Sequence, residues 1–293
     1  MPTLAILLIL CSALMHAGWN LLVHAAREDR DLLIRINLVF GLMGLGPVLV
    51  AEWYWPMLTP FAWLMLAIAG VGQTIYSVGL SKGYRRGDFT IVYPLVRALP
   101  ILFLAAVDIV RDRMPNLPGF AGIVLVMVGC ALLGMNAMRR SQHARVSSLW
   151  LWIALAAAGT VCYSTADKFG LELMPKGINA ALRYGVIEFL LSGLGASLCL
   201  RRSPRELWRL GPNVRWPKIF LAAFMLGITH VLLLWAYQLV DQISYVSAGR
   251  QISIAIGVVL AAWFLHERVG VLRILFAIII AAGVAMIAMG GQL

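Results

Sequence analysis

Near its start the chain reads LAILLILCSALMHAGWNLLVHA (residues 4–25), an apolar run long enough to cross a lipid bilayer. A helix needs about 20 mostly apolar residues to span the hydrocarbon core. Nine further runs of this kind follow, at Leu32–Ala51, Phe61–Leu80, Phe89–Val110, Leu117–Met138, Leu149–Phe169, Ile178–Leu200, Pro217–Leu239, Ile243–Leu265 and Val271–Met289. In lipid only helices and closed barrels satisfy their backbone hydrogen bonds, and these runs are too long for barrel strands. The sequence therefore predicts an all-α polytopic membrane protein with ten transmembrane helices.

The composition agrees with a membrane protein. Hydrophobic residues make up 61% of the chain and charged residues 13%, and the mean hydropathy is +0.87. The net charge of +11 must then reside in short loops, where basic residues orient the protein and contact anionic lipid headgroups. No soluble basic module remains to hold nucleic acid, so membrane lipid is the expected partner of this charge. The four cysteines lie inside apolar runs without metal-type spacing, and we expect no metal and no cofactor.

The basic residues are distributed unequally between the two sides of the predicted membrane. One side carries Arg27, Arg30, Lys82, Arg85, Arg86, Arg139, Arg140, Arg145, Arg201, Arg202, Arg205, Arg209, Arg215, Lys218, Arg268 and Arg273. The other carries only Arg111, Arg113, Lys168 and Lys176. The positive-inside rule makes the first side cytoplasmic and places both termini on the opposite side. We expect a multi-pass protein of a bacterial cytoplasmic (inner) membrane.

The predicted helices divide into two sets of five, separated by a basic linker at residues 140–146. Gly72–Thr74 resembles Gly227–Thr229 in the second set. The loop Glu52–Pro60 has no basic residue, whereas its counterpart Arg201–Lys218 has six. Because five is odd, a duplicated copy inserts upside down. The sequence therefore predicts two inverted five-helix repeats, residues 1–143 and 144–293, a build typical of secondary transporters.

Four arginines lie within apolar runs, where an ionisable group is costly and normally faces a partner or a cavity. Arg35 and Arg183 lie near the ends of their runs and are expected to snorkel to the interface. Arg97 and Arg250 lie deep in the fourth and ninth runs, and a guanidinium binds carboxylate or phosphate in a two-pronged manner. These two predict a site for an anionic group. The alternative is that one of them pairs permanently with Glu188, which we interpret as the only carboxylate at the middle of an apolar run.

Glu188 is also the candidate for coupling transport to protons, because burial and nearby charge both alter how a carboxylate holds a proton. His16 and His230 lie equally deep, and imidazole titrates in a useful range. The alternative is that each histidine is a hydrogen-bonded packing residue.

Polar and aromatic residues recur at spacings of three and four, which places them on common helix faces. Such faces suit a pocket for a small amphipathic metabolite, although Trp and Tyr near helix ends also serve as interface anchors. The predicted lining is His16, Trp19, Asn20, Gln73, Tyr76, Tyr93, Arg97, Tyr163, His230, Trp235, Tyr237, Arg250 and Gln251.

Glycines and prolines add two expectations about the backbone. Pro94 and Pro100 flank Arg97 and predict a local break in the fourth run, which would free backbone groups to line a site. Gly79, Gly83 and Gly87 recur every four residues and predict close helix packing, as does a glycine cluster at residues 41–46.

Three features together resemble a known family. They are the stretch His16-Ala-Gly-Trp-Asn20, the acidic residues after the fourth and ninth runs (Asp112-Arg113 and His266-Glu267-Arg268), and the glycine-bearing Gly122–Gly134 and Gly283–Gly290. In these the chain is similar to EamA-type ten-helix members of the drug/metabolite transporter superfamily. The resemblance implies a ten-helix basket with a central cavity, alternating access, and export or exchange of small metabolites. It also implies cytoplasmic termini, opposite to what the loop charges of this chain predict.

The expected function is a secondary transporter, an exporter or exchanger of a small organic metabolite such as an amino acid, carboxylate, organophosphate or phosphonate. Protons or a counter-substrate would be its coupling partner. A lipid-phosphate or drug-type carrier of the same fold is the alternative. A membrane enzyme is disfavoured because the chain has no HExxH, no GxSxG and no pair of aspartates within the runs. A channel would need rings of like residues in a symmetric oligomer.

Overall fold

The computed structural model describes residues 1–22, 31–86, 89–138, 147–210, 215–264 and 270–290. Within these ranges every regular element is a helix, and ten helical segments are long and apolar enough to cross a membrane. The predicted all-α, multi-pass architecture is confirmed. The helices that follow the predicted runs are α1 (Thr3–Leu22), α2 (Leu32–Tyr54), α3 (Pro60–Tyr84), α4 (Phe89–Val110), α5 (Leu117–Met138), α6 (Ser147–Glu172), α7 (Ile178–Cys199), α9 (Trp216–Leu239), α10 (Ile243–Gly249) with α11 (Ile252–Phe264), and α12 (Val271–Gly290).

The ninth apolar run is the one that breaks, between α10 and α11 at Arg250 and Gln251. The Gln251 side chain donates from Nε2 to the carbonyl of Ser247 at 2.9 Å, the acceptor that its own backbone N–H would use in a continuous helix. Its backbone N–H bonds instead to Ala248, one residue closer. The predicted break in the fourth run is wrong. α4 continues through Pro94 and Pro100, since membrane helices tolerate the lost hydrogen bond of a proline.

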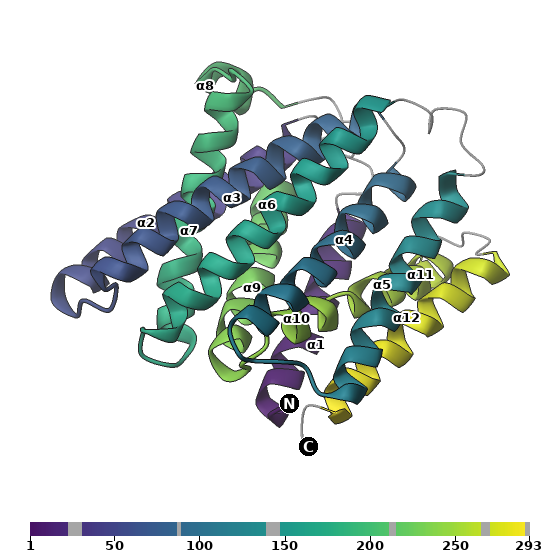
Figure 1. The fold of residues 1–293 in the computed structure, drawn as a ribbon. Helices are drawn as coiled ribbons and strands as arrows, with labels where there is room; N and C mark the ends of the chain where they lie inside the picture. Colours follow the sequence, from purple (N-terminus) through teal and green to yellow (C-terminus); the bar gives the residue numbers. More distant parts are fainter. Residues whose placement is uncertain (23–30, 87–88, 139–146, 211–214, 265–269, 291–293) are drawn as a thin grey trace.

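Helices from the two halves of the chain lie against each other in Figure 1: α3 packs on α6, α1 on α9, α2 on α7, and α5 on α12. Glycine permits the closest of these approaches. A Cβ at Gly159 of α6 would lie 2.5 Å from the backbone nitrogen of Tyr76, and one at Gly122 of α5 would lie 2.6 Å from the carbonyl oxygen of Gly283. Gly79 packs closely as predicted, with its Cβ position 2.8 Å from the Ala156 backbone, whereas Gly87 lies outside the described residues.

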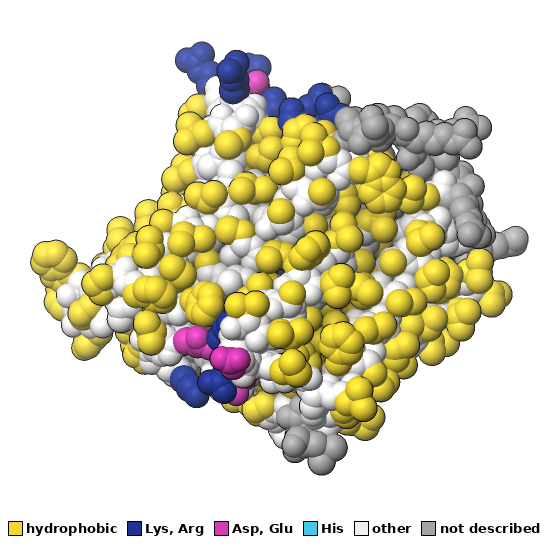
Figure 2. Space-filling model, in the orientation of Figure 1, with side chains coloured by type: hydrophobic (Ala, Val, Ile, Leu, Met, Phe, Trp, Pro, Cys, Tyr) yellow, Lys and Arg dark blue, Asp and Glu magenta, His cyan; other side chains and the backbone are white. Residues whose placement is uncertain are grey.

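Met1 and the end of α12 at Gly290 lie at one face of the helix bundle, which we call the terminal face (Figure 1). The Met1 amine donates to the Ala288 carbonyl at 3.4 Å, and the Asn116 amide donates to the Gly290 carbonyl. The opposite face, here called the basic face, carries a short helix that the sequence did not predict, α8 (Pro204–Trp208). Figure 2 shows Lys and Arg gathered over α8 and a broad apolar surface between the two faces, as expected of a protein surrounded by lipid.

Arg35 and Arg183 do not snorkel to the interface, so that prediction is wrong. Arg35 is buried and donates to the carbonyls of Leu207 at 2.6 Å and Arg209 at 2.9 Å, which satisfies the C-terminal end of α8. Arg183 is buried near the terminal face and donates to the Glu52 carboxylate at 2.6 Å. Both arginines therefore have internal partners, and both hold the fold together.

Candidate functional site

A cavity of about 760 Å³ lies inside the bundle. At one end it includes Leu32 at the start of α2 and Arg85 just after α3, which places that end at the basic face. At the other end it reaches Tyr163, Arg97 and Arg250, deep within α6, α4 and the broken ninth span. The cavity therefore extends from the basic face toward the middle of the bundle.

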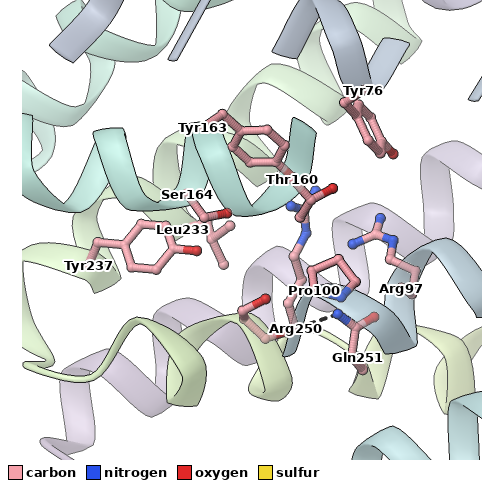
Figure 3. Close-up of a pocket in the computed structure, with 11 residues that line it drawn as sticks. Tyr76, Arg97, Pro100, Thr160, Tyr163, Ser164, Leu233, Tyr237, Arg250 and Gln251 are labelled. Atoms are coloured by element: carbon pink, nitrogen blue, oxygen red, sulfur yellow. Dashed lines mark hydrogen bonds between the residues drawn. The ribbon is translucent and has the colours of Figure 1, made fainter. Parts of the chain in front are cut away.

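Most of the residues predicted to bind substrate line this cavity. They are His16, Trp19, Asn20, Gln73, Tyr76, Tyr93, Arg97, Tyr163, His230 and Arg250. Tyr237 and Gln251 line a smaller adjoining pocket, to which Arg97 and Arg250 also contribute (Figure 3). Trp235 lines neither of these two pockets and packs half-buried against the apolar core. Glu188 lies behind His230 and does not line either of them.

Arg97 and Arg250 meet at the deep end of the cavity, where their guanidinium groups extend into the same space (Figure 3). They are 7% and 8% exposed, and within the described ranges no carboxylate oxygen lies within 4.0 Å of either. The Nε atom of each is buried without a hydrogen-bond partner in that part of the chain. The alternative pairing of an arginine with Glu188 is not formed, because Glu188 contacts His230 instead. Two buried cations without a carboxylate partner favour an anionic ligand.

The His16–Asn20 stretch holds one of these arginines in place. Arg97 Nη2 lies 2.7 Å from Nε2 of His16 and 3.3 Å from the Tyr93 hydroxyl. Nε1 of Trp19 lies 3.2 Å from Nδ1 of the same histidine, whose neutral ring accepts a hydrogen bond at only one of its two nitrogens. The Asn20 amide donates to the His16 backbone carbonyl at 2.8 Å. His16 thus belongs to the arginine end of the cavity, whereas His230 belongs to a separate acidic cluster.

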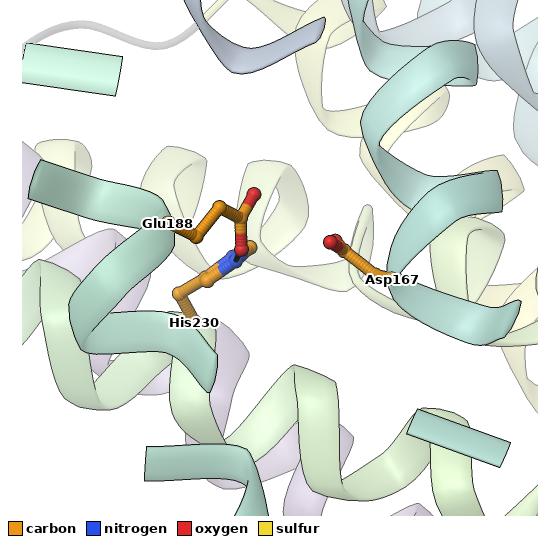
Figure 4. Close-up of side chains that lie close together, drawn as sticks. All are labelled: Asp167, Glu188 and His230. Atoms are coloured by element: carbon orange, nitrogen blue, oxygen red, sulfur yellow. Dashed lines mark hydrogen bonds and ion pairs between the residues drawn. The ribbon is translucent and has the colours of Figure 1, made fainter. Parts of the chain in front are cut away.

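The acidic cluster consists of Asp167 on α6, Glu188 on α7 and His230 on α9 (Figure 4). Nε2 of His230 lies 2.7 Å from Oε2 of Glu188, and one ligand atom of each residue lies within 4.8 Å of the others. Both carboxylates are fully buried. Asp167 lies near the end of its predicted run, so the sequence did not place it beside Glu188. Asp167 shares a helix face with Tyr163, but only the packing of α6 against α7 and α9 brings it to Glu188.

A second group of charges ties helices together at the terminal face. Arg111 lies 2.6 Å from the Glu172 carboxylate and donates to the Asp241 carbonyl at 3.1 Å. Lys168 donates to the carbonyls of Tyr237 and Val240, each at 2.7 Å. These contacts join α4 and α6 to the connection between α9 and α10, on the side away from the cavity's wide end.

Asp108 is a member of this group that sequence reasoning missed. It is fully buried on α4 and accepts from the backbone N–H groups of Ile243 and Ser244, each at 2.8 Å. It thereby caps the N-terminus of α10, the helix that ends at Arg250. Asp112, the acidic residue of the motif predicted after the fourth run, is exposed and adopts a φ of 56°. His266-Glu267-Arg268 lies outside the described residues.

Other cavity residues went unnoticed although a signal for them existed. Ser77 and Ser81 follow the predicted Gln73 at intervals of four residues along α3, and all three line the cavity. Ser77 lies 3.3 Å from the hydroxyl of Ser192, which also accepts from Asn37 at 3.1 Å. The spacing was visible in the sequence, but serine alone is too common in membrane helices to indicate a cavity.

The sequence matches no protein-family model and no curated protein. Solved structures do match it in fold. One of them, described only as "Crystal structure of protein", has a TM-score of 0.69 and 14% sequence identity over 97% of each chain. At this level of identity the likeness shows the fold alone.

Proposed function

We propose that this protein is a secondary transporter of a small organic metabolite that carries an anionic group, such as a carboxylate or a phosphate. The observation that carries the proposal is the pair of buried arginines at the deep end of the cavity, without a carboxylate within 4.0 Å in the described chain. A bound anion would supply the missing counter-charge, and a guanidinium matches carboxylate and phosphate geometry.

The remainder of the cavity suits the organic part of such a metabolite. Tyr76 and Tyr163 approach edge to face, with ring centroids 5.9 Å apart, beside the two arginines. Aromatic walls with a few fixed polar groups are typical of sites for small molecules. The volume of about 760 Å³ accommodates a metabolite together with water.

Alternating access would use the difference between the two faces. The cavity reaches the basic face, whereas Arg111, Lys168 and Glu172 tie helices together at the terminal face. A carrier of this design would break those contacts and close the basic face around Arg85 and Leu32. Loop charge supports a cytoplasmic basic face, and therefore an inward-open form in a bacterial inner membrane.

The helix contacts support an origin from two inverted repeats, residues 1–143 and 144–293. If α1 corresponds to α6, α2 to α7, α3 to α9 and α5 to α12, then the α3–α6 contact corresponds to the α1–α9 contact. The α2–α7 and α5–α12 contacts correspond to themselves. This pattern is what an approximate two-fold axis in the membrane plane produces. It agrees with the resemblance to EamA-type drug/metabolite transporters, which we retain as part of the proposal.

The test is thermal stabilisation of the purified protein by a library of anionic, cationic and neutral metabolites. Ligands that bind the folded state raise its apparent stability. We expect anions to stabilise the parent protein and not an R97Q/R250Q variant, while R86Q retains the effect. Arg86 is a matched control because it is an exposed arginine at the basic face that does not line the cavity.

Transport itself is tested by counterflow uptake of the best anion into proteoliposomes, where a carrier exchanges solute one for one. Stabilisation by neutral or cationic solutes, equal in the parent and the double variant, would refute the anion site. Binding of an anion without counterflow would refute the transporter.

A further inference from the structure

The acidic cluster behind the cavity wall contains polar atoms that the fold leaves without partners. Both carboxylate oxygens of Asp167 and Oε1 of Glu188 are buried and accept no hydrogen bond from the described chain. Asp167 is fully buried, and its carboxylate points toward Glu188 and His230 (Figure 4). A buried polar group normally has a partner, so these oxygens indicate an ion that binds between them.

We propose that Asp167, Glu188 and His230 form a proton-binding site that takes up a proton when an anion binds at Arg250. The inference rests on the proposed function for its anion, but the proton site itself is a property of the cluster. No covalent chemistry is involved beyond the O–H bond formed when a carboxylate accepts the proton.

Because Asp167, Glu188 and His230 lie so close together, the cluster must hold at least one proton. Glu188 and His230 already share a hydrogen atom across the 2.7 Å contact between Oε2 and Nε2. If Asp167 and Glu188 were both ionised beside a neutral imidazole, two negative charges would lie within a few ångströms in a medium of low dielectric constant. That arrangement is strongly unfavourable, and a proton shared within the cluster removes one of the charges.

The charged and titratable groups that act on Asp167 lie on α6 itself, on α7, on α9 and at the break between α10 and α11. Glu188 and Tyr184 face it from α7, His230 and Tyr237 from α9, Cys162 from its own helix, and Arg250 from the break between α10 and α11. Arg250 is the cation in this set. Its positive charge offsets part of the negative charge of the cluster as long as no anion binds to it.

This arrangement links the two sites. An anion bound at Arg250 cancels the positive charge that offsets the carboxylates of the cluster, so a proton then becomes their favoured counter-ion. The bound anion therefore raises the affinity of the protein for the proton, and by linkage the bound proton raises its affinity for the anion by the same factor. His230 lines the cavity while the carboxylates lie behind it, which gives protons a route from cavity water.

The proton site is tested first without any anion, by infrared spectroscopy of the purified full-length protein during acidification. We expect a carboxylic-acid C=O band that is absent from D167N, shifted in D167E and unchanged in D112N. Asp112 is a suitable control because it is exposed on the terminal face. Spectra of D167N and D167E that both equal the parent spectrum would overturn the assignment, whatever the protein transports.

The coupling is tested with sulfate, an anion that carries no proton of its own near neutral pH. Sulfate added to weakly buffered protein should cause uptake of up to about one proton per bound sulfate, reduced at least tenfold in D167N. Sulfate that binds without proton uptake would overturn the coupling and leave the proposed anion site intact. Stabilisation by Zn²⁺ or Mn²⁺ that D167N abolishes would show a metal site, and so would overturn the proton assignment.

Discussion

The cap that Asp108 provides for α10 leads to a quantitative prediction about stability. Its two carboxylate oxygens accept separately from the backbone N–H groups of Ile243 and Ser244, each at 2.8 Å, and the side chain is fully buried. Within the described chain the carboxylate is the side-chain acceptor that both N–H groups use. D108A therefore leaves two buried donors unsatisfied.

An unsatisfied buried donor costs about 1–3 kcal/mol, so D108A should lower the free energy of unfolding by about 2–6 kcal/mol. D108N retains one carbonyl oxygen and should lose about half of that. Because α10 ends at Arg250, its loosening should also weaken anion binding. The Arg111 side chain, 3.6 Å from Asp108, keeps its contacts with Glu172 and the Asp241 carbonyl and adds little to the loss.

The assay is reversible unfolding of the purified protein in mixed micelles, with the free energy of unfolding measured for D108A, D108N and D112N. D112N is the matched control: it changes the same residue type one turn further on, where the side chain is exposed, and asparagine tolerates the φ of 56°. A D108A variant within about 0.5 kcal/mol of D112N would refute the capping role, since that is the range of neutral surface substitutions.

Three further predictions concern the fold. R183Q should destabilise the protein by about 3–5 kcal/mol in the same unfolding assay, because it leaves the half-buried Glu52 carboxylate without its cation, yet anion affinity should not change. G159L should yield no folded protein on size-exclusion chromatography, because its Cβ would lie 2.5 Å from the α3 backbone, whereas G46L, with nothing within 4 Å, should behave as the parent. Hydrogen bonds from Ser203 lower the pKa of Glu206 from 4.5, so the ionised carboxylate stabilises α8 above pH 4.5. This stabilisation is lost as the pH falls through the lowered pKa, and hydrogen exchange of the α8 amides should then become faster.

The sequence by itself predicts the class and much of the cavity. Membrane-spanning length is a local property, so ten apolar runs could be counted without knowing how they pack. Arg97 and Arg250 were recognisable as unusual for the same reason, because a guanidinium in the middle of an apolar run is costly wherever its helix lies. The spacing of His16 and Asn20 likewise follows from one helix alone, and both line the cavity.

Partners across helices could be decided only by the tertiary structure. Whether Arg35 reached lipid headgroups or the end of α8 depended on a short helix far along the chain. The break at Gln251 involves a side chain that takes the carbonyl acceptor of its own backbone N–H. No proline stands near this position to indicate a break in the sequence. Asp167, Glu188 and His230 come together through the packing of α6 with α7 and α9. Periodicity fixes the face on which a residue lies, but the rotation of each helix against its neighbours is set by long-range contacts, and these determine which charges meet.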